Sequence, residues 1–324
     1  MLYLNLHSRL TITNPETNEA IQFDHIASAE IKKSVKVLGD TAEITIPRRY
    51  GKLKNKEVLK YIKPGYKLVL ELGYNKEYFA EFTGYVREIE SGYPLRLYCD
   101  DALYLLRKNN FNKSWKTISL RELLTIIAPG YKIECPDVNM GAFQIDNANT
   151  VTVLRAIQNQ YGFYSFLKGD TLYCQFAYDV RGVGDIHTYN FSKNVKKSDL
   201  KFKRKEDYSI RIKAISNQRT GKKITVEVGS KEHDASLRTL NFKDKTAAEL
   251  RTLATKELER LVFDGFEGSI TGLGYPRVDV GDTLKIVSPK EPERDGSYLV
   301  ESMTIRYGNA YYERICELSY KMTS

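Results

Sequence analysis

The stretch that decides the fold is residues 29–47, which read AEIKKSVKVLGDTAEITIP. Its second half alternates between apolar and polar residues: Ala42, Glu43, Ile44, Thr45 and Ile46. Strict alternation predicts a half-buried β-strand, and Gly39-Asp40 predicts a tight turn before it. The stretch contains no residue pattern typical of catalysis. Such strands therefore either surround an active site formed by other residues, or have a structural function of their own.

The same pattern recurs through the first hundred residues. KLVLEL (67–72), AEFTGYVRE (80–88) and LRLYC (95–99) each have one apolar face, and residues 9–23 predict a hairpin that turns at Asn14-Pro15. In the second of these strands, Ala80 and Phe82 are expected to face inward and Glu81 outward. About six strands with one apolar face each favour a closed or nearly closed barrel, because closure hides the strand edges.

The pattern changes after residue 107. A capping box, Ser119 with Glu122, opens a predicted helix, and a second helix is expected to stop at Gly162. Two short strands follow it. Asp100 is interpreted as a helix cap just before this region. We therefore expect a first β-barrel over 1–107 and a small mixed α/β unit over 108–192.

Strands return in the last part of the chain. The basic run 193–205, KNVKKSDLKFKRK, has little apolar content and is interpreted as a solvated linker or loop. An amphipathic helix is predicted at about 246–262, opened by the capping box of Thr246 and Glu249. The strands that begin near Val280 repeat the pattern of those that begin near Pro64, which favours a second β-barrel over 193–324.

Composition limits the function classes. The 324 residues carry a formal net charge of +9 and include 23 tyrosines, which suit surfaces that become interfaces. No apolar run approaches the roughly 18 residues of a membrane helix, and the amino terminus reads as a strand rather than a signal peptide, so we expect synthesis in the cytoplasm without membrane insertion. The basic runs contain few aromatic residues, which disfavours nucleic-acid binding and gives no reason to expect sequence-specific recognition.

The search for catalytic or metal-binding patterns finds little. The chain contains no Walker loop, nucleophile elbow or zinc-protease motif. Glu88 and Glu90 share one predicted strand, and Asp282 and Asp295 lie where turns favour them. The histidines and cysteines are widely separated: His7, His25, His187, His233, Cys99, Cys135, Cys174 and Cys316. We therefore expect no catalytic residue, no cofactor, no metal site and no enzymatic activity.

The order of these features resembles the baseplate hub proteins of long-tailed phages, the late-control-D-like family. This family is related to the hub half of type VI secretion spike proteins. The resemblance is carried by segments along most of the chain: SAEIKKSVKVLGDTAEITIP, IKPGYKLVLELGY, AEFTGYVREIE, LRLYCDDALYLLRK, SLRELLTII, TVTVLRAIQNQYGFYSFLKGDTLYC, LATKELERLVFDGFEGSITGLGYPRVDVGDTLKI, DGSYLVESMTIRYG and YYERICELSY.

The resemblance implies a mainly β fold, with two tube-type β-barrels that flank a small mixed α/β unit. It implies a homotrimer whose six barrels form a ring, which joins a sixfold tail tube to a threefold spike in the baseplate of a virion. The expected partners are the tail tube protein, a separate spike protein and other baseplate proteins, since the chain ends at Ser324 with no room for a fused needle or hydrolase.

Three alternatives stay open: a tail-tip carbohydrate or receptor binder, a basic β-barrel that binds nucleic acid, and a peptidoglycan hydrolase. For the hub, the predicted assembly surface is the basic loop 48–56, because a long loop between two strands is free to reach a neighbouring subunit. The loop's interface residues are Arg48, Arg49, Tyr50, Lys52, Lys54 and Lys56.

Overall fold

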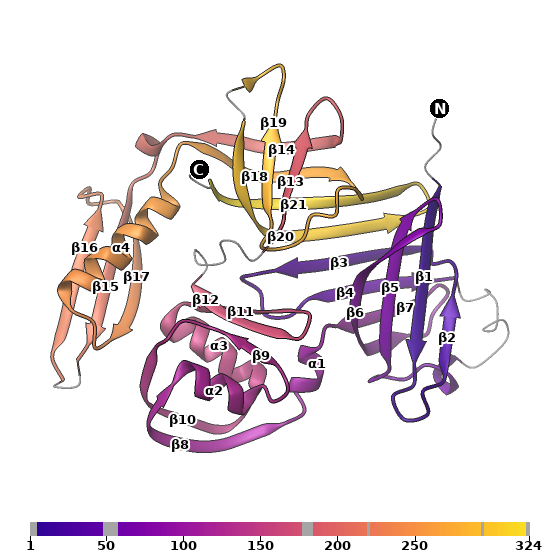
Figure 1. The fold of residues 1–324 in the computed structure, drawn as a ribbon, viewed down its shortest axis with the longest axis horizontal. Helices are drawn as coiled ribbons and strands as arrows, with labels where there is room; N and C mark the ends of the chain where they lie inside the picture. The colour runs from indigo at the N-terminus through magenta and orange to yellow at the C-terminus, as the bar shows by residue number, and fades with distance from the viewer. Residues whose placement is uncertain (1–4, 48–57, 177–183, 219–220, 293–294, 322–324) are drawn as a thin grey trace.

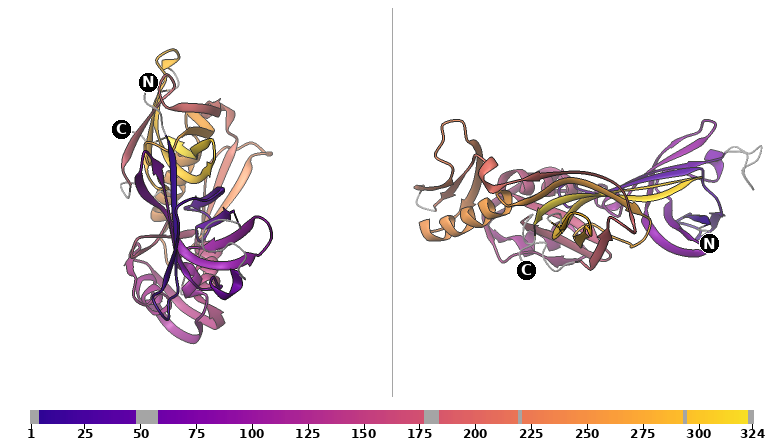
Figure 2. Two further views of the ribbon diagram at one scale, coloured as in Figure 1. Left: turned by 90° about the vertical axis from the view of Figure 1, so that its right-hand side faces the viewer. Right: turned by 90° about the horizontal axis from the view of Figure 1, so that it is seen from above.

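The computed structural model describes residues 5–47, 58–176, 184–218, 221–292 and 295–321. The molecule is elongated, with one large curved sheet and two smaller parts beside it (Figures 1 and 2). The large sheet has 13 strands, drawn from both ends of the chain. The predicted fold class, mainly β with a smaller mixed α and β part, is confirmed.

The first strand set of this sheet comes from residues 6–100 and has the order β3-β4-β7-β6-β5-β1-β2. The predicted alternation is confirmed, since Ala42, Ile44 and Ile46 are buried while Glu43 is exposed. The turn at Asn14-Pro15 joins the first two strands. The members are β1 (Leu6–Thr13), β2 (Ala20–Phe23), β3 (Ser28–Ser34), β4 (Thr41–Ile46), β5 (Lys67–Tyr74), β6 (Glu77–Glu90) and β7 (Leu95–Asp100), with a short 3₁₀ turn η2 (Val58–Lys60) before β5.

The second strand set has the order β14-β18-β21-β20, and β19 joins β20 to β13. One expectation is wrong here. The basic run was expected to be a linker or loop, but most of it forms strand β14, because pairing with β18 satisfies its backbone groups while the lysines point to solvent. The members are β13 (Ile186–Asn190), β14 (Val195–Lys203), β18 (Gly265–Leu273), β19 (Thr283–Val287), β20 (Gly296–Gly308) and β21 (Tyr311–Lys321); a 3₁₀ turn, η3 (Lys205–Asp207), follows β14.

The middle of the chain forms an α/β unit with its own apolar core. Both predicted helix signals are confirmed: Ser119 and Glu122 form a capping box, and Gly162 ends the second helix in the left-handed conformation with φ 73°. Its elements are α1 (Leu103–Leu106), β8 (Asn110–Ser119), α2 (Leu120–Ile127), β9 (Lys132–Glu134), β10 (Asn139–Asn149), α3 (Thr150–Tyr161), β11 (Phe163–Lys168) and β12 (Thr171–Phe176).

A third, smaller part lies at one end of the molecule (Figure 2, right). It consists of the three-stranded sheet β16-β15-β17 and helix α4, which begins with the predicted capping box of Thr246 and Glu249. Its bounds are β15 (Ile210–Asn217), β16 (Lys223–Gly229), β17 (Ser236–Lys243) and α4 (Ala247–Leu261). Within the described residues, none of the helices has the length and apolar character needed to cross a bilayer.

The two strand sets are joined edge to edge. β3 pairs with the second half of β20 in antiparallel register, so residues 28–34 lie beside residues 302–308 in the middle of the molecule (Figure 1). One apolar core extends through both sets. Across the described ranges the pairing runs from β14 to β2 without closing on itself, so each set is a curved, open sheet. The domain boundaries at 107/108 and 192/193 stay predictions.

Candidate functional site

The predicted basic assembly loop lies outside the described residues. Arg48, Arg49, Tyr50, Lys52, Lys54 and Lys56 all belong to the range 48–57. The structure places only its two flanks, because β4 ends at Ile46 and η2 begins at Val58. The assignment of this loop to an interface therefore stays a prediction.

The histidines are dispersed in the structure as they are in the sequence. His7 packs edge-on against Tyr78, with ring centroids 6.1 Å apart. His187 Nε2 lies 3.1 Å from Asp282 Oδ2, and Asp282 also accepts hydrogen bonds from the backbone N–H groups of Asp279 and Asp185. Asp282 therefore orders a turn, as expected. Among the residues that the structure describes, no group of three or more His, Cys, Asp or Glu side chains is placed to hold a metal ion.

The acidic residues of the first strand set serve structural contacts. Glu90 accepts hydrogen bonds from Arg96 and Tyr98, while Glu88 is exposed. The interpretation of Asp100 as a helix cap is wrong. Its carboxylate pairs with two arginines at 2.8 and 2.5 Å, and Asp101 instead accepts the backbone N–H of Leu103 at the start of α1.

All four cysteines are buried free thiols, as the sequence suggested. Burial raises the pKa of Cys174 and of Cys316 to about 12, and it also raises the pKa of Cys99 and Cys135. A thiol with a raised pKa is a weak nucleophile, because the thiolate is the reactive form. These cysteines therefore fill the core and are poor candidates for chemistry.

Ion pairs accompany the joint between β3 and β20. Arg306 Nε donates to Glu30 Oε2 at 2.9 Å, and these two residues lie directly opposite each other in the register. Just beyond the end of β3, Lys36 Nζ lies 2.6 Å from Glu301 Oε1. Cross-strand pairs of opposite charge stabilise an antiparallel register. The joint is thus specified by side chains as well as by backbone hydrogen bonds.

A β-bulge in β6 turns a carboxylate into the core. Opposite β5, the register of β6 shifts so that Leu70 faces Phe82 but Glu71 faces Ala80, and Glu81 is the extra residue. The sequence predicted that Glu81 faces outward and Ala80 inward, but the structure shows the reverse. The reason is that the extra residue of a bulge reverses which side chains of the strand face the core. This register shift depends on the partner strand, so the alternation alone could not reveal it.

The inward Glu81 is the centre of a buried network from both strand sets. Its Oε1 accepts hydrogen bonds from Arg314 Nη2 at 2.6 Å, Tyr312 OH at 2.8 Å and Arg277 Nε at 3.1 Å. Burial alone would lower the pKa of Arg314, but the Glu81 carboxylate outweighs it and the pKa is raised. Arg314 also donates to the carbonyl oxygens of Gly274 and Val278, so its charge is fully paired.

Two tyrosine side chains, Tyr74 and Tyr312, pack against each other next to this network. Tyr74 OH donates to the carbonyl oxygen of Tyr312 and accepts the N–H of Gly274, both at 3.1 Å. Gly274 is required at this place, because a Cβ there would lie 2.3 Å from the ring of Tyr312. Tyr74 of the first strand set is thus hydrogen-bonded to two residues of the second part of the chain, Gly274 and Tyr312, at least 200 positions away in sequence. These contacts constrain the angle between the two strand sets.

A cavity of about 410 Å³ lies where the two strand sets meet the β11–β12 hairpin. Lys33, Asp40, Asp101 and Asp279 line it, and Lys33 Nζ contacts Asp279 Oδ2 at 2.9 Å. Asp40 keeps some exposed surface on the cavity wall, yet burial raises its pKa to about 8 despite the nearby Lys33 charge. Burial raises the pKa of Asp101 as well.

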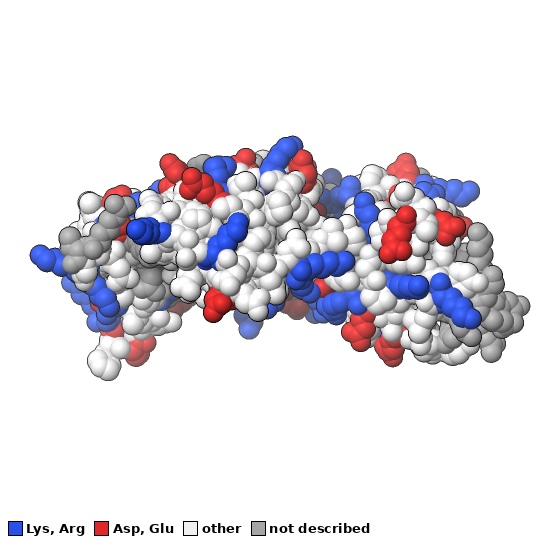
Figure 3. Space-filling view, turned by 90° about the horizontal axis from the view of Figure 1, so that it is seen from below, with Lys and Arg blue, Asp and Glu red and all other residues white. Residues whose placement is uncertain are grey.

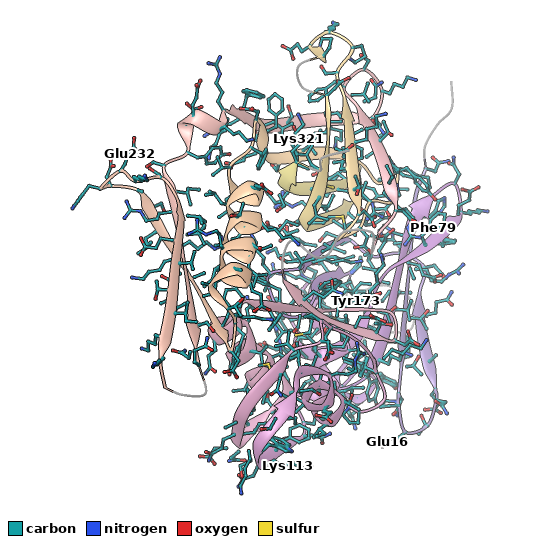
Figure 4. All side chains as sticks on the ribbon, turned by 60° about the vertical axis from the view of Figure 1, so that its left-hand side comes forward. Glu16, Phe79, Lys113, Tyr173, Glu232 and Lys321 are labelled. Atoms are coloured by element: carbon teal, nitrogen blue, oxygen red, sulfur yellow. The ribbon has the colours of Figure 1, made fainter. Side chains whose placement is uncertain are left out.

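The β11–β12 hairpin connects the α/β unit to the main sheet. Phe163, Leu172 and Cys174 belong to the core of the α/β unit. Phe166 instead belongs to the main core, and Tyr173 stacks on it with ring centroids 5.0 Å apart. Figure 4 shows Tyr173 in the middle of the molecule, whereas Lys113, Glu16 and Glu232 lie at its periphery. Alternate hairpin residues thus enter two different cores.

The surface charge is mixed on the face that Figure 3 shows. Lysine and arginine side chains are scattered there among acidic and uncharged ones, so the cations visible on this face are not gathered into one patch. Proteins that bind a nucleic-acid backbone usually concentrate positive charge along a groove or stripe. The face shown therefore lacks the charge arrangement typical of a nucleic-acid-binding surface.

Comparison with solved structures identifies the fold. This chain superposes on a 43 kDa tail protein of prophage MuSo2 from Shewanella oneidensis with a TM-score of 0.65 and 14% identity, covering 98% of both chains. It superposes on a tail protein from Neisseria meningitidis MC58 with a TM-score of 0.64 and 14% identity, covering 97% of this chain and 96% of that one.

A component of the Escherichia coli type VI secretion system, the c3393 protein, has the same fold, with a TM-score of 0.56 and 8% identity over 97% of this chain and 79% of that chain. No protein-family model and no curated protein matches the sequence. The resemblance to phage tail and type VI secretion proteins is thereby confirmed as a shared fold, since identities this low establish fold and no more.

Proposed function

We propose that this protein is a structural component of the tail of a phage or phage-like particle, where it serves as the baseplate hub. The observation that carries the proposal is the match along nearly the whole chain to a phage tail protein, with 98% of both chains covered. The protein works through association rather than catalysis. Its buried ionisable groups, such as Glu81 and Arg314, are used to hold the two strand sets together.

The hub is proposed to be a homotrimer. Each chain contributes two curved strand sets, so three chains supply six of them around a ring. Such a ring presents approximate sixfold symmetry to a tail tube and true threefold symmetry to a spike. Its partners are then the tail tube protein, a separate spike protein and other baseplate proteins, and its place is the tail or baseplate of the virion.

Sedimentation at rising protein concentration tests this proposal. We expect a mass of three chains, reached either by the protein alone or after the tube and spike proteins are added, and a ring in electron micrographs. A stable complex of this kind buries roughly 1,200 Å² or more per pairing. A protein that stays monomeric at every concentration, with both partners present, would rule out the trimeric hub.

A further inference from the structure

The two strand sets share one strand order. The first has β3-β4-β7-β6-β5 and the second has β14-β18-β21-β20-β19, with every neighbouring pair antiparallel. A row of directly opposed residues crosses each set. The first row is Ile31, Ala42, Cys99 and Val86; the second row is Ser198, Ile270, Cys316 and Met303. The rows define which residues correspond, and each contains a buried cysteine at the third strand of its set, Cys99 on β7 and Cys316 on β21.

This correspondence predicts a second strand pairing that is equivalent to the β3–β20 joint. β3 corresponds to β14, and β20 corresponds to β6, so the counterpart of the joint would pair β14 with β6. Within one chain that pairing does not form. Among the described residues, β14 pairs with β18 alone, and residues 88–90 of β6 pair with β7 alone.

We propose that the free edge of β14 pairs, antiparallel, with residues 88–90 of β6 in a second copy of this chain. This contact repeats between subunits the joint that β3 and β20 form within one. It rests on the proposed function, because a ring of three chains is what brings the copies side by side. Each chain offers β14 to one neighbour and β6 to the other, which is the head-to-tail arrangement that closes a ring.

The register follows from the same correspondence. Inside the chain, Glu30 lies opposite Arg306 and accepts its hydrogen bond. The counterpart of Glu30 is Lys197, one residue before Ser198, and the counterpart of Arg306 is Glu90, which faces Arg96 as Arg306 faces Glu313. The proposed contact therefore sets Lys197 opposite Glu90 of the partner subunit. Both charges are reversed relative to the internal joint, and they remain complementary.

The wider charge distribution agrees with this register. The β14 edge carries Lys196, Lys197, Lys201 and Lys203, whereas the end of β6 carries Glu88 and Glu90. The side chains of Lys197 and Glu90 are 68% and 50% exposed, so both are accessible. The register also places Asp199 opposite Glu88 of the partner subunit, a like-charge pair that opposes the contact, and Lys197 and Lys201 on either side of Asp199 offset it. A basic edge thus meets an acidic one.

Lysines on an edge strand have a second role, since they discourage unwanted pairing and aggregation. Charge reversal separates the two roles. A glutamate on an edge strand discourages unwanted pairing as a lysine does, but it cannot form an ion pair with Glu90. We expect Lys197→Glu, and separately Glu90→Lys, to weaken trimer association roughly tenfold, because an attractive pair becomes a repulsive one at every joint. The double reversal Lys197→Glu/Glu90→Lys should restore association.

The matched controls are Lys113→Glu and Glu16→Lys, two exposed positions far from this edge (Figure 4). Each control makes the same change in net charge as one of the test variants. Equal loss in the controls, or no recovery in the double reversal, would overturn the pairing. Circular dichroism on all variants checks that each one is folded.

Cross-linking gives an independent readout. The four native cysteines are buried, so a short bis-maleimide should react with cysteines introduced at the surface. The variant Lys197→Cys/Glu90→Cys should give covalent trimers, a mixture of the two single variants should give covalent dimers, and either single variant alone should give neither. Trimers that form normally but fail to cross-link would overturn this pairing and leave the hub proposal standing. A protein that never leaves the monomeric state would overturn both.

Discussion

Glu81 and Arg314 carry opposite charges at the place where the two strand sets meet, and the side chain of each is 1% exposed. Two buried charges stabilise a protein only while both are present, because the loss of one leaves the other without compensation in a poorly polarisable interior. Here a bulge in β6 brings the carboxylate inward, and Tyr312 and Arg277 satisfy it further. The pair therefore fixes the geometry between the two sets.

Replacement of Glu81 by glutamine should be strongly destabilising. The change keeps the shape of the side chain but leaves the buried Arg314 charge unpaired, so the free energy of unfolding should fall by about 3–5 kcal/mol. Urea denaturation measures this difference. Glu77→Gln, on the same strand but exposed, is the matched control and should change the free energy by no more than about 0.5 kcal/mol. Equal effects of the two variants would contradict the role assigned to Glu81.

Asp40 gives the cavity between the strand sets a pH dependence. Burial raises the pKa of Asp40 from 3.8 to about 8. Between these values the folded protein binds a proton that the unfolded chain has released. The stabilisation due to protonated Asp40 is therefore complete below about pH 4 and is lost as the pH rises through about 8.

The Asp40→Asn variant should become more stable relative to the wild type as the pH rises across this window, and the difference should level off above about pH 8. The reason is that the amide stays neutral where the wild-type carboxyl group must ionise next to Asp101 and Asp279. Chemical denaturation at a series of pH values measures the difference, with the exposed Asp234→Asn variant as control. A difference that does not change with pH would contradict the assigned burial of Asp40.

At the scale of elements, the molecule consists of parts with unequal cores. The main core includes residues from both strand sets. Among the side chains that the structure describes, the small sheet β16-β15-β17 and α4 share a core of only five buried residues: Ile212, Ala214, Val226, Leu250 and Ala254. Regions that bury little apolar surface open more easily than the rest of a protein. The small sheet is therefore expected to be the least stable part of the described structure.

Hydrogen exchange should reveal this difference directly. Backbone amides of β15, β16 and β17 should exchange faster than those of β20 and β21, because fewer buried contacts oppose local opening. Leu250→Ala, which removes a fully buried side chain from α4, should accelerate exchange in the small sheet and leave β20 unchanged. Protection of the small sheet equal to that of β20 would show that it does not open as a separate unit.

At the scale of the whole molecule, the proposed ring depends on many weak surface contacts. A single exposed ion pair contributes about 0–1 kcal/mol, so no one charge is expected to decide assembly. Several charges together steer the approach of a partner and are sensitive to ionic strength. The basic loop 48–56 is proposed as a second assembly surface of this kind, in addition to the edge of β14.

Replacement of Arg48, Arg49, Lys52 and Lys54 by serine should weaken association between hub subunits or between hub and tube, and added salt should weaken the wild-type association in the same direction. Analytical ultracentrifugation measures both effects. The matched control removes four exposed lysines elsewhere: Lys113, Lys116, Lys222 and Lys223. If the loop variant assembles as well as the wild type at physiological salt, the loop serves only as solvated surface.

The sequence by itself determined the local structure of this protein. The alternation at Ala42, Ile44 and Ile46 gave strand β4, and the capping boxes at Ser119 and Thr246 gave the starts of α2 and α4. These signals depend on a side chain and its near neighbours along the chain, so they can be read without knowledge of the fold. The order of such elements was also sufficient to predict the fold shared with phage tail proteins.

Only the tertiary structure decided which edges meet and which side chains turn inward. The sequence of β14 predicts a loop, because apolar and polar residues do not alternate regularly along it. It forms a strand because it pairs with β18, some 70 residues away. Glu81 faces the core because a bulge opposite β5 shifts the register, and its partner Arg314 lies 233 residues further along the chain. Register and pairing arise from contacts between distant segments, and for that physical reason the local pattern of residues does not contain them.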